Sequence, residues 1–181
     1  SSNVQTGGAW QVAQCYATVT FHGNGGTFVE GNGETLVQTK SFQGSTSVSN
    51  GTLNVSPTNY SISAPALNTR TGYTLTGWNT AENGGGDTLS GNSTYSGNKV
   101  YYAQWTLSSY TITYYDGDYA TALTGLTPAT YTIETGVATL PTPVKSGYTF
   151  NGWYNSNGTR VTSIAANTTG NISLYAHWNA D

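Results

Sequence analysis

Hydrophobic and polar residues alternate with a period of two along several short stretches of this chain, for example residues 17–21 and residues 101–105. Side chains of a β-strand point to opposite faces in turn, so this alternation predicts strands with one buried face. Long amphipathic runs of helical period are missing. The sequence therefore predicts a mainly β protein with at most one short helix in each copy of its repeat, and the candidate helices are residues 120–126 and 164–167.

The chain contains an internal repeat. The heptapeptide Gly-Tyr-Thr-Leu-Thr-Gly-Trp at residues 72–78 returns as Gly-Tyr-Thr-Phe-Asn-Gly-Trp at residues 147–153. A second match has nearly the same offset, with Tyr-Ala-Gln-Trp at 102–105 and Tyr-Ala-His-Trp at 175–178. Two matches at nearly one offset indicate a tandem duplication of a single structural unit.

The duplication predicts two small domains. The first repeat covers residues 17–105, a short linker covers 106–109, and the second repeat covers 110–181. Residues 1–16 have no counterpart in the repeat and form an N-terminal extension. The first repeat is also the longer one, and we interpret its insertion before residue 72 as an extra hairpin.

The N-terminal extension has a strand-like pattern of its own, with hydrophobic residues at Trp10, Val12 and Cys15. An added strand of this kind either covers an edge of its own sheet or adds to the sheet edge of another molecule. We therefore treat these three residues as a candidate assembly strand. Cys15 is the single cysteine, so no disulfide forms within the chain, and its ordinary role would be that of a small buried hydrophobe.

Aromatic residues of the repeated motifs are the best candidates for the two cores. An indole ring buries a large apolar area, which matters most in a small domain. The candidate core residues are Trp78, Trp105, Trp153, Trp178, Tyr73 and Tyr148.

Charged residues make up only 7% of the chain, against about 25% in ordinary soluble domains. The net charge is -3 and the five Lys and Arg residues are scattered, so no basic stripe can neutralise phosphates and nucleic acid is excluded as a partner. No apolar run approaches the roughly 20 residues of a membrane span, so membrane insertion is not expected. The chain begins at Ser1 and contains no Met, which is typical of a processed, secreted product.

No constellation of residues predicts catalysis. The carboxylate pairs Asp116 with Asp118 and Glu82 with Asp87 lie in Gly-rich turns, where such groups ordinarily accept backbone hydrogen bonds. The two histidines lie in different repeats, so they form neither a triad nor a zinc cluster. The sequence predicts no catalytic residue, no cofactor and no metal site, although residues 116–118 and 30–34 carry oxygen ligands at alternate positions without matching a full calcium loop.

Two features concern carbohydrate. Sequons for N-glycosylation are frequent, as expected for a chain rich in Asn, Ser and Thr. The candidate glycosylation sites are Asn50, Asn59, Asn92, Asn157, Asn167 and Asn171. The densest aromatic patch is formed by Tyr114, Tyr115 and Tyr119, which would either stack on sugars or pair across strands to stabilise a sheet, and the second interpretation is favoured.

The second copy of the motif resembles the Listeria/Bacteroides repeat, the family of the B repeat of internalin B. The resemblance rests on Leu-Pro-Thr-Pro-Val-Lys-Ser at 140–146, Gly-Tyr-Thr-Phe-x-Gly-Trp-Tyr at 147–154 and Leu-Tyr-Ala-His-Trp at 174–178. It implies two tandem β-grasp-like (ubiquitin-like) domains on the outside of a microbial cell, used as spacer or interaction modules. It implies no catalytic residue and no cofactor.

These observations predict a non-enzymatic, extracellular structural protein of a microbial cell surface. It would be either an adhesin segment or the subunit of a self-assembling filament, and the unmatched N-terminal strand favours the filament, because strand addition could link copies. Its expected partners are other copies of itself, or a surface protein or glycan of a host or microbe. The alternative is a carbohydrate-binding module of a secreted or surface protein.

Overall fold

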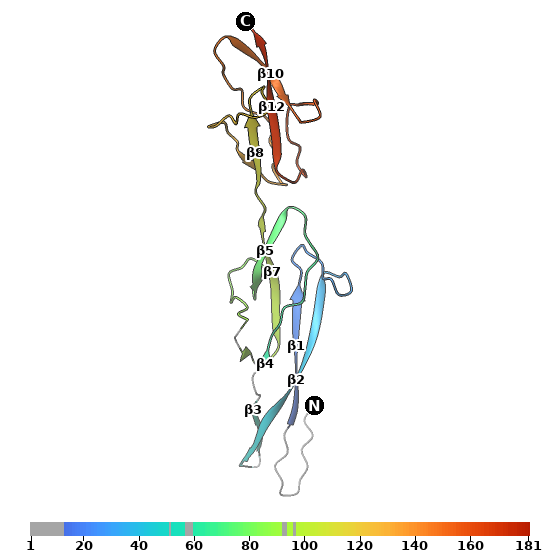
Figure 1. Ribbon diagram of the computed structural model, residues 1–181. Helices are drawn as coiled ribbons and strands as arrows, with labels where there is room; N and C mark the ends of the chain where they lie inside the picture. Colours follow the sequence, from blue (N-terminus) through green and yellow to red (C-terminus); the bar gives the residue numbers. More distant parts are fainter. Residues whose placement is uncertain (1–12, 51, 57–59, 92–93, 96) are drawn as a thin grey trace. The chain divides into compact units, whose positions relative to one another are not determined.

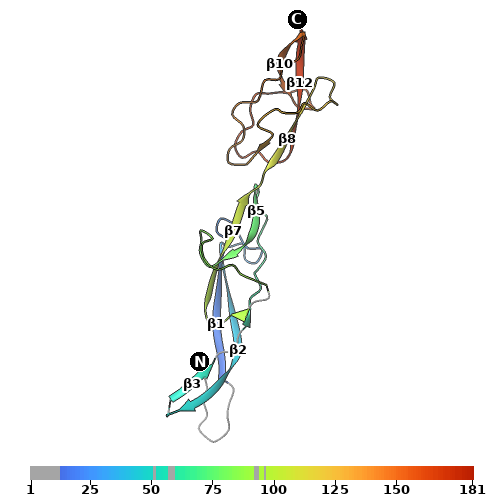
Figure 2. The ribbon, with the colours of Figure 1, turned by 90° about the vertical axis from the view of Figure 1, so that its left-hand side faces the viewer.

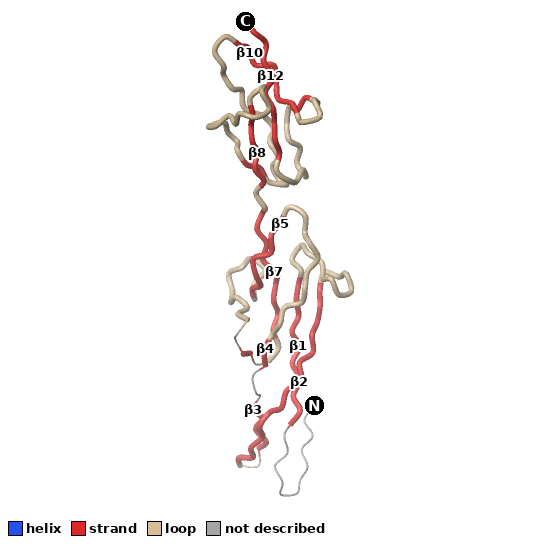
Figure 3. Tube along the Cα trace, viewed as in Figure 1, coloured by secondary structure: helices blue, strands red, loops and turns tan. Residues whose placement is uncertain are grey.

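The computed structural model describes residues 13–50, 52–56, 60–91, 94–95 and 97–181. Strands and loops make up this part of the chain, with no helix in it (Figure 3). Its contacts divide the chain into two compact units. The first unit contains the residues up to Arg70 and Leu75–Trp105, and the second contains Thr71–Thr74 and Thr106–Asp181.

The first repeat is built on a five-stranded sheet in the order β3-β2-β1-β7-β5 (Figure 1). β1 is antiparallel to β2 and parallel to β7, and a separate two-stranded sheet pairs β4 with β6. β2 and β3 form a hairpin within the inserted segment (Figure 2). The strands are β1 (Ala13–His22), β2 (Thr35–Ser49), β3 (Thr52–Ser56), β4 (Tyr60–Ser61), β5 (Tyr73–Asn79), β6 (Thr94–Tyr95) and β7 (Lys99–Leu107).

The second repeat has a five-stranded sheet in the order β11-β10-β12-β8-β9. β12 and β8 are parallel, and β12 is antiparallel to β10. This parallel pair corresponds to β7 and β1 of the first repeat, so the first and last strands of each repeat are neighbours at the sheet centre. The strands are β8 (Tyr110–Tyr115), β9 (Thr130–Tyr131), β10 (Tyr148–Tyr154), β11 (Arg160–Val161) and β12 (Ile172–Ala180).

An asparagine before the last strand fixes the start of the parallel pair in both repeats. Asn98 Oδ1 accepts a hydrogen bond from the backbone N–H of Thr18 at 2.9 Å, and Asn171 Oδ1 accepts one from Thr111 at 3.0 Å. Each backbone N–H needs a hydrogen-bond acceptor, and neither of these two N–H groups is paired with the neighbouring parallel strand. The side chain therefore supplies the acceptor at the point where the neighbouring strand begins.

A buried tyrosine makes a second equivalent contact. The hydroxyl of Tyr60 donates to the carbonyl of Gly97, and that of Tyr131 donates to the carbonyl of Gly170. Burial raises the pKa of both phenols, because the charged form is disfavoured away from water. The two repeats thus share contacts as well as sequence motifs.

Each sheet packs one face on its own core. β7 and β12 have the same alternation of buried and exposed positions over nine residues, as the period of two predicts. The first core contains Ala17, Val19, Phe21, Phe28, Tyr60, Ile62, Trp78, Tyr101 and Ala103. The second contains Ile112, Tyr114, Tyr131, Val137, Leu140, Trp153, Ile164, Leu174 and Ala176.

A β-bulge places the tryptophan of the repeated heptapeptide in the second core. The register between β10 and β12 shifts between Phe150 and Trp153, and Gly152 has a φ of 110°, which favours glycine. Trp153 is 2% exposed, and its indole N–H donates to the carbonyl of Pro141 at 2.7 Å. Trp78, its counterpart, is 7% exposed.

The tyrosine of the heptapeptide lies outside the core, which corrects the sequence prediction. Tyr148 is 45% exposed, and Tyr73 is only half-buried. Tyr148 pairs with Ala180 at the far end of the ladder between β10 and β12, beyond the residues that the core covers. Trp105 and Trp178 are partly buried and pack against the edges of the two cores.

The mainly β prediction is confirmed, but neither candidate helix forms. In the segment 120–126, Ala122 bridges to Tyr115 and Leu123 donates its backbone N–H to the carbonyl of Tyr114. In the segment 164–167, Ile164 bridges to Val137. Extended pairing thus takes the backbone groups that a helix would use, and the β-grasp assignment is not confirmed.

The N-terminal extension is described only from Ala13. Gln14, Cys15 and Tyr16 belong to β1 and pair with β2, whereas Trp10 and Val12 lie outside the described residues. No helix in the described part of the chain is long and apolar enough to cross a membrane.

We predict that Trp153→Ala destabilises the second unit by about 3–5 kcal/mol, because it removes a buried ring and leaves a cavity. Tyr148→Ala, five residues earlier in the same motif, should cost less than about 1 kcal/mol because its side chain is exposed. Hydrogen exchange of the β12 amides in the intact chain would measure both effects. Equal losses of protection would show that Tyr148 anchors the core, as the sequence predicted.

Candidate functional site

The face of the second sheet opposite the core carries a cluster of aromatic side chains, which we call the aromatic face. Tyr115 comes from β8, Tyr154 from β10, Tyr175 and His177 from β12, and Tyr119 from the loop after β8. Each strand residue on this face follows a buried one, because successive side chains point to opposite faces. The cluster is therefore a consequence of the same alternation that builds the core.

The rings of the aromatic face stack on one another. Tyr175 stacks on Tyr115 with centroids 5.3 Å apart and on Tyr119 with centroids 4.7 Å apart. Tyr154 and His177 stack at 3.7 Å with their planes 12° apart. Such pairs contribute about 0.5–1.5 kcal/mol each beyond the burial of their area. The cluster therefore stabilises a sheet face that has no second layer of strands in the described residues.

Tyr119 is the most exposed member of the cluster. Its side chain is 49% exposed, and its hydroxyl lies 3.1 Å from Nε2 of His177. Its backbone has a φ of 61°, which is uncommon for an aromatic residue and requires support from the surrounding loop.

Asp118 supplies that support. Its carboxylate accepts hydrogen bonds from the backbone N–H groups of Ala120 at 3.0 Å and Thr121 at 2.8 Å, and from the Thr121 hydroxyl. The bond from the hydroxyl, followed by the two backbone bonds, lowers the pKa of Asp118 to about 2. The loop is thus tied together by an ionised carboxylate.

Asp116 joins the same loop to β12. Its carboxylate accepts hydrogen bonds from the Gly117 N–H and from Nε1 of Trp178, both at 2.7 Å, and it forms an ion pair with Lys145 at 3.2 Å. The Gly117 bond makes the largest contribution to lowering the pKa of Asp116, and the bonds from Lys145 and Trp178 add to it. The ammonium of Lys145 also lies 5.6 Å from the Trp178 ring centroid, within cation–π range.

The first repeat keeps the closing tryptophan but not the acid. Nε1 of Trp105 donates to the backbone carbonyl of Gly23 at 2.9 Å, and the guanidinium of Arg70 lies 5.3 Å from its ring centroid. Gly23 occupies the position of Asp116 in the repeat alignment. A backbone carbonyl therefore replaces the carboxylate as the acceptor of the indole N–H.

The first repeat also lacks most of the aromatic face. His22 stacks on Tyr102 with centroids 4.7 Å apart, which reproduces the pair of Tyr115 and Tyr175 alone. Gln104 stands in the place of His177 and donates to backbone carbonyls of the loop after β5. Asn79 stands in the place of Tyr154 and is 5% exposed. The aromatic cluster thus distinguishes the second repeat.

An open groove lies beside Tyr119 on the second unit, with a volume of about 520 Å³. We call it the Tyr119 groove. It is lined by Gly117, Tyr119, Asn151, Ala176, His177, Trp178 and Asn179. None of these residues carries a permanent charge, so the groove offers amide, hydroxyl and imidazole groups together with aromatic surface.

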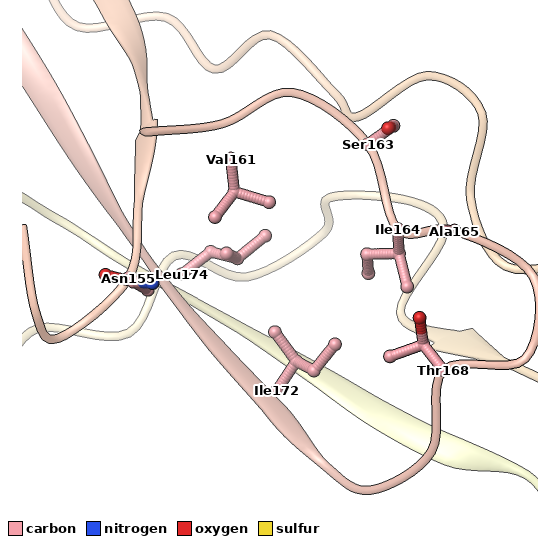
Figure 4. A pocket seen from close by; sticks show the side chains of 8 residues that line it. All are labelled: Asn155, Val161, Ser163, Ile164, Ala165, Thr168, Ile172 and Leu174. Carbon is pink, nitrogen blue, oxygen red and sulfur yellow. The ribbon is translucent and has the colours of Figure 1, made fainter. Parts of the chain in front are cut away.

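A second hollow opens toward the core of the second unit and has a volume of about 310 Å³ (Figure 4). The side chains of Val161, Ile164, Ile172 and Leu174 point toward one another in it. Its lining contains no titratable side chain. This hollow has apolar surface and no group that could perform acid or base chemistry.

The three tyrosines predicted for glycan stacking do not form one exposed surface. Tyr114 is 3% exposed, and its hydroxyl donates to the carbonyl of Pro128 at 2.6 Å. Burial raises its pKa. Tyr114 faces the core because it follows Ile112 at a spacing of two, whereas Tyr115 and Tyr119 belong to the aromatic face. The prediction for Tyr114 is therefore wrong.

Sequence reasoning missed Tyr154, Tyr175 and His177 as partners of Tyr115 and Tyr119. The sequence did contain the signal. Each of these residues directly follows one that the repeated motif or the alternation predicts to be buried, so it should lie on the opposite face of the sheet. The stacking across three strands could not be found without knowing the strand order, which places β12 between β8 and β10.

The predicted glycosylation sites remain predictions. Asn50, Asn157, Asn167 and Asn171 are exposed, and Asn171 uses its Oδ1 atom to cap Thr111. Asn59 and Asn92 lie outside the described residues. In the described part of the chain, no group of three or more His, Cys, Asp or Glu side chains is arranged to hold a metal ion.

The acidic turn predicts a pH dependence of stability. The pKa of Asp118 is lower in the folded state than its ordinary value of about 3.9, so its contribution is complete above about pH 4 and is lost as the pH falls toward 2. We expect the free energy of unfolding of the second unit to fall in this range, and Asp118→Asn to reduce that fall. Urea titrations at several pH values would measure it.

Asp87→Asn in the first unit is the matched control, because it removes one carboxylate outside this loop. If the Asp118→Asn and wild-type chains lost stability equally over this pH range, the loop carboxylate would not be the source of the dependence.

Comparison with known proteins places these features in a family. Residues 18–104 and 110–177 both match the Listeria-Bacteroides repeat domain. The chain is 40% identical over 92 residues to the "Putative Gly-rich membrane protein" of Evansella cellulosilytica, covering 46% of this chain and 11% of that protein. It is 34% identical over 122 residues to "Internalin H" of Listeria monocytogenes, covering 65% of this chain and 21% of that protein.

The matched part is thus a small share of both relatives, so their whole-protein activities do not transfer directly. The family assignment rests instead on the two matched segments, which together cover most of the chain. The protein belongs to the Listeria-Bacteroides repeat domain family.

Proposed function

We propose that this protein is a structural component of a microbial cell surface and that copies of it join through strand addition at the first repeat, forming a filament. The observation that carries the proposal is the length of β1. Its pairing with β2 runs from Ala13 to His22, whereas its pairing with β7 begins only at Val19. Ala13–Thr18 therefore has a described strand on one side only (Figure 1).

The orientation of the backbone at this edge follows from one hydrogen bond. The N–H of Thr18 points away from β2, because it donates to Asn98 at the start of β7. Backbone groups alternate in direction along a strand. The N–H and C=O groups of Gln14 and Tyr16 therefore also point away from β2, toward the open side.

An open strand edge is a template for pairing with another chain. Main-chain hydrogen bonds from an added strand supply affinity in such contacts, and the side chains supply specificity. Residues 1–12, with Trp10 and Val12, are the segment of this chain that we propose as the added strand. A head-to-tail contact of this kind produces a filament when its rotation does not close into a ring.

The corresponding strand of the second repeat lacks such an overhang. β8 begins at Tyr110, and its pairing with β12 begins two residues later, at Ile112. The capping bond from Thr111 to Asn171 satisfies the N–H that precedes the paired region. Among the described residues, only the first repeat therefore offers several strand residues at this position that are paired on one side alone. The proposed contact would accordingly have a direction.

The family and the names of the relatives support a place at the cell surface. They support an adhesin segment as well as a filament subunit. The open edge favours the filament, because an adhesin spacer has no need of an unpaired strand. A non-enzymatic role is consistent with the site geometry, in which the ionised carboxylates of the second unit hold a loop together.

We predict that the native chain forms regular fibres visible by negative-stain electron microscopy and that Tyr16→Pro abolishes them. Proline removes the N–H that faces the open edge while leaving the hydrogen bonds to β2 in place. The Tyr16 side chain is 57% exposed, so its loss should not disturb the core. Light scattering would measure the mass in parallel.

Tyr16→Ala is the matched control, because it removes the same side chain and keeps the N–H. It should still form fibres. Deletion of residues 1–12 should abolish fibres while leaving β1 complete. A native particle that stays near 19.0 kDa at high concentration would overturn the filament and leave an adhesin segment, and fibres that survive Tyr16→Pro would place the contact elsewhere.

A further inference from the structure

We propose that the Tyr119 groove of the second unit is a binding site for a neutral oligosaccharide. The inference is independent of filament formation, because the groove lies on the second repeat and the open strand edge on the first. The three features that carry it are the shape of the groove, the free polar groups on its walls and the absence of charge in its lining.

Three separate elements line the groove. β12, which lies between β8 and β10 in the sheet, contributes the segment from Ala176 to Asn179. Gly117 and Tyr119, from the loop after β8, line one side, and Asn151 of β10 lines the other. Its volume of about 520 Å³ falls within the range of about 300–1,000 Å³ that is typical of small-molecule sites.

The bulge in β10 determines which side chain of this strand faces the groove. The extra residue lies between Phe150 and Trp153, which both contact the core. Asn151 is exposed as a result, on the same side of the sheet as the groove. The bulge therefore anchors the core and also directs an amide toward the groove.

The amides of Asn151 and Asn179 have no hydrogen-bond partner within the part of the chain that the structure describes. Each offers a carbonyl acceptor and two N–H donors. Sugar hydroxyls donate and accept in the same way, so an amide can bind two neighbouring hydroxyls at once. Both side chains are exposed, so a ligand would replace water at groups that the fold does not use.

Tyr119 supplies the aromatic surface. Its ring stacks on Tyr175, and the loop held by Asp118 keeps it in place. Since the side chain is 49% exposed, about half of its surface remains open to a ligand. A tyrosine suits an amphipathic ligand, because it combines an apolar ring with a hydroxyl.

The charges around the groove indicate a neutral ligand. The lining contains no Lys, Arg, Asp or Glu, so phosphate, sulfate or carboxylate groups would meet no cation in it. Asp116 lies beside the groove but is paired with Lys145. A charged ligand would lose its hydration without gaining a charged partner, which is costly. A neutral sugar avoids that cost.

The first repeat provides an internal comparison. Thr76 occupies the position of Asn151 and Thr106 that of Asn179, and the Gly-Asn-Gly-Gly turn at 23–26 contains no aromatic residue. The Oγ1 atom of Thr76 already donates to the carbonyl of Gln104 at 3.2 Å. The proposal therefore places one site on each chain, in the second repeat.

We predict that the intact chain binds neutral oligosaccharides. The probes are hexasaccharides of glucose, mannose, galactose and N-acetylglucosamine, with heparin and sialylated glycans for comparison, on an array and then by isothermal titration calorimetry. The double variant Asn151→Ala with Asn179→Ala should weaken binding roughly tenfold or more, because it removes the hydrogen bonds to the ligand. Circular dichroism would show that the fold is unchanged.

Thr76→Ala with Thr106→Ala is the matched control in the first repeat and should leave binding unchanged. Tyr119→Ala should also weaken binding. Absence of binding to every neutral hexasaccharide at millimolar concentration would overturn the proposal. So would binding that the double asparagine variant retains, or binding to heparin alone. None of these results depends on whether the chain forms fibres, so the two proposals can fail separately.

Discussion

The parallel pairing of the first and last strands of each repeat is the constraint on which the rest of this structure depends. It brings the two ends of a short segment together at the centre of a sheet, so that a core can form from residues distant in sequence. The asparagine cap at Thr18 and at Thr111 sets where this pairing starts. Once the register is fixed, every residue of the central strands is assigned to the core or to the opposite face.

This constraint explains which parts of the fold could be predicted from the sequence. The strands and the buried positions of Trp78 and Trp153 follow from alternation and duplication, because both are local patterns. Tyr148 could not be placed in the same way. Its position within a shared motif suggests a core role, yet exposure depends on where the ladder with β12 ends, and no local pattern gives the length of a partner strand.

The candidate site shows a similar division. The period of two places Tyr114 and Tyr115 on opposite faces of β8. Applied along the whole strand, it assigns Tyr114 to the core. The groove needs more information, since it joins the loop at Gly117 and Tyr119 to the bulge at Asn151 across β12. The difference between the repeats also lies in their loops: a Gly-rich turn follows β1, whereas an acidic loop that holds an aromatic ring follows β8. The two repeats therefore share the arrangement of their central strands and differ in the loops that connect the strands.

The ion pair between Lys145 and Asp116 has a consequence for the environments that this protein tolerates. This ion pair belongs to a chain in which only 7% of all residues are charged. At moderate ionic strength, dissolved salt acts on exposed ion pairs by screening their charges. A fold held by stacked rings and amide hydrogen bonds gives salt little to screen, so its stability should change little between fresh water and physiological ionic strength. That property suits a molecule whose surroundings the cell does not control.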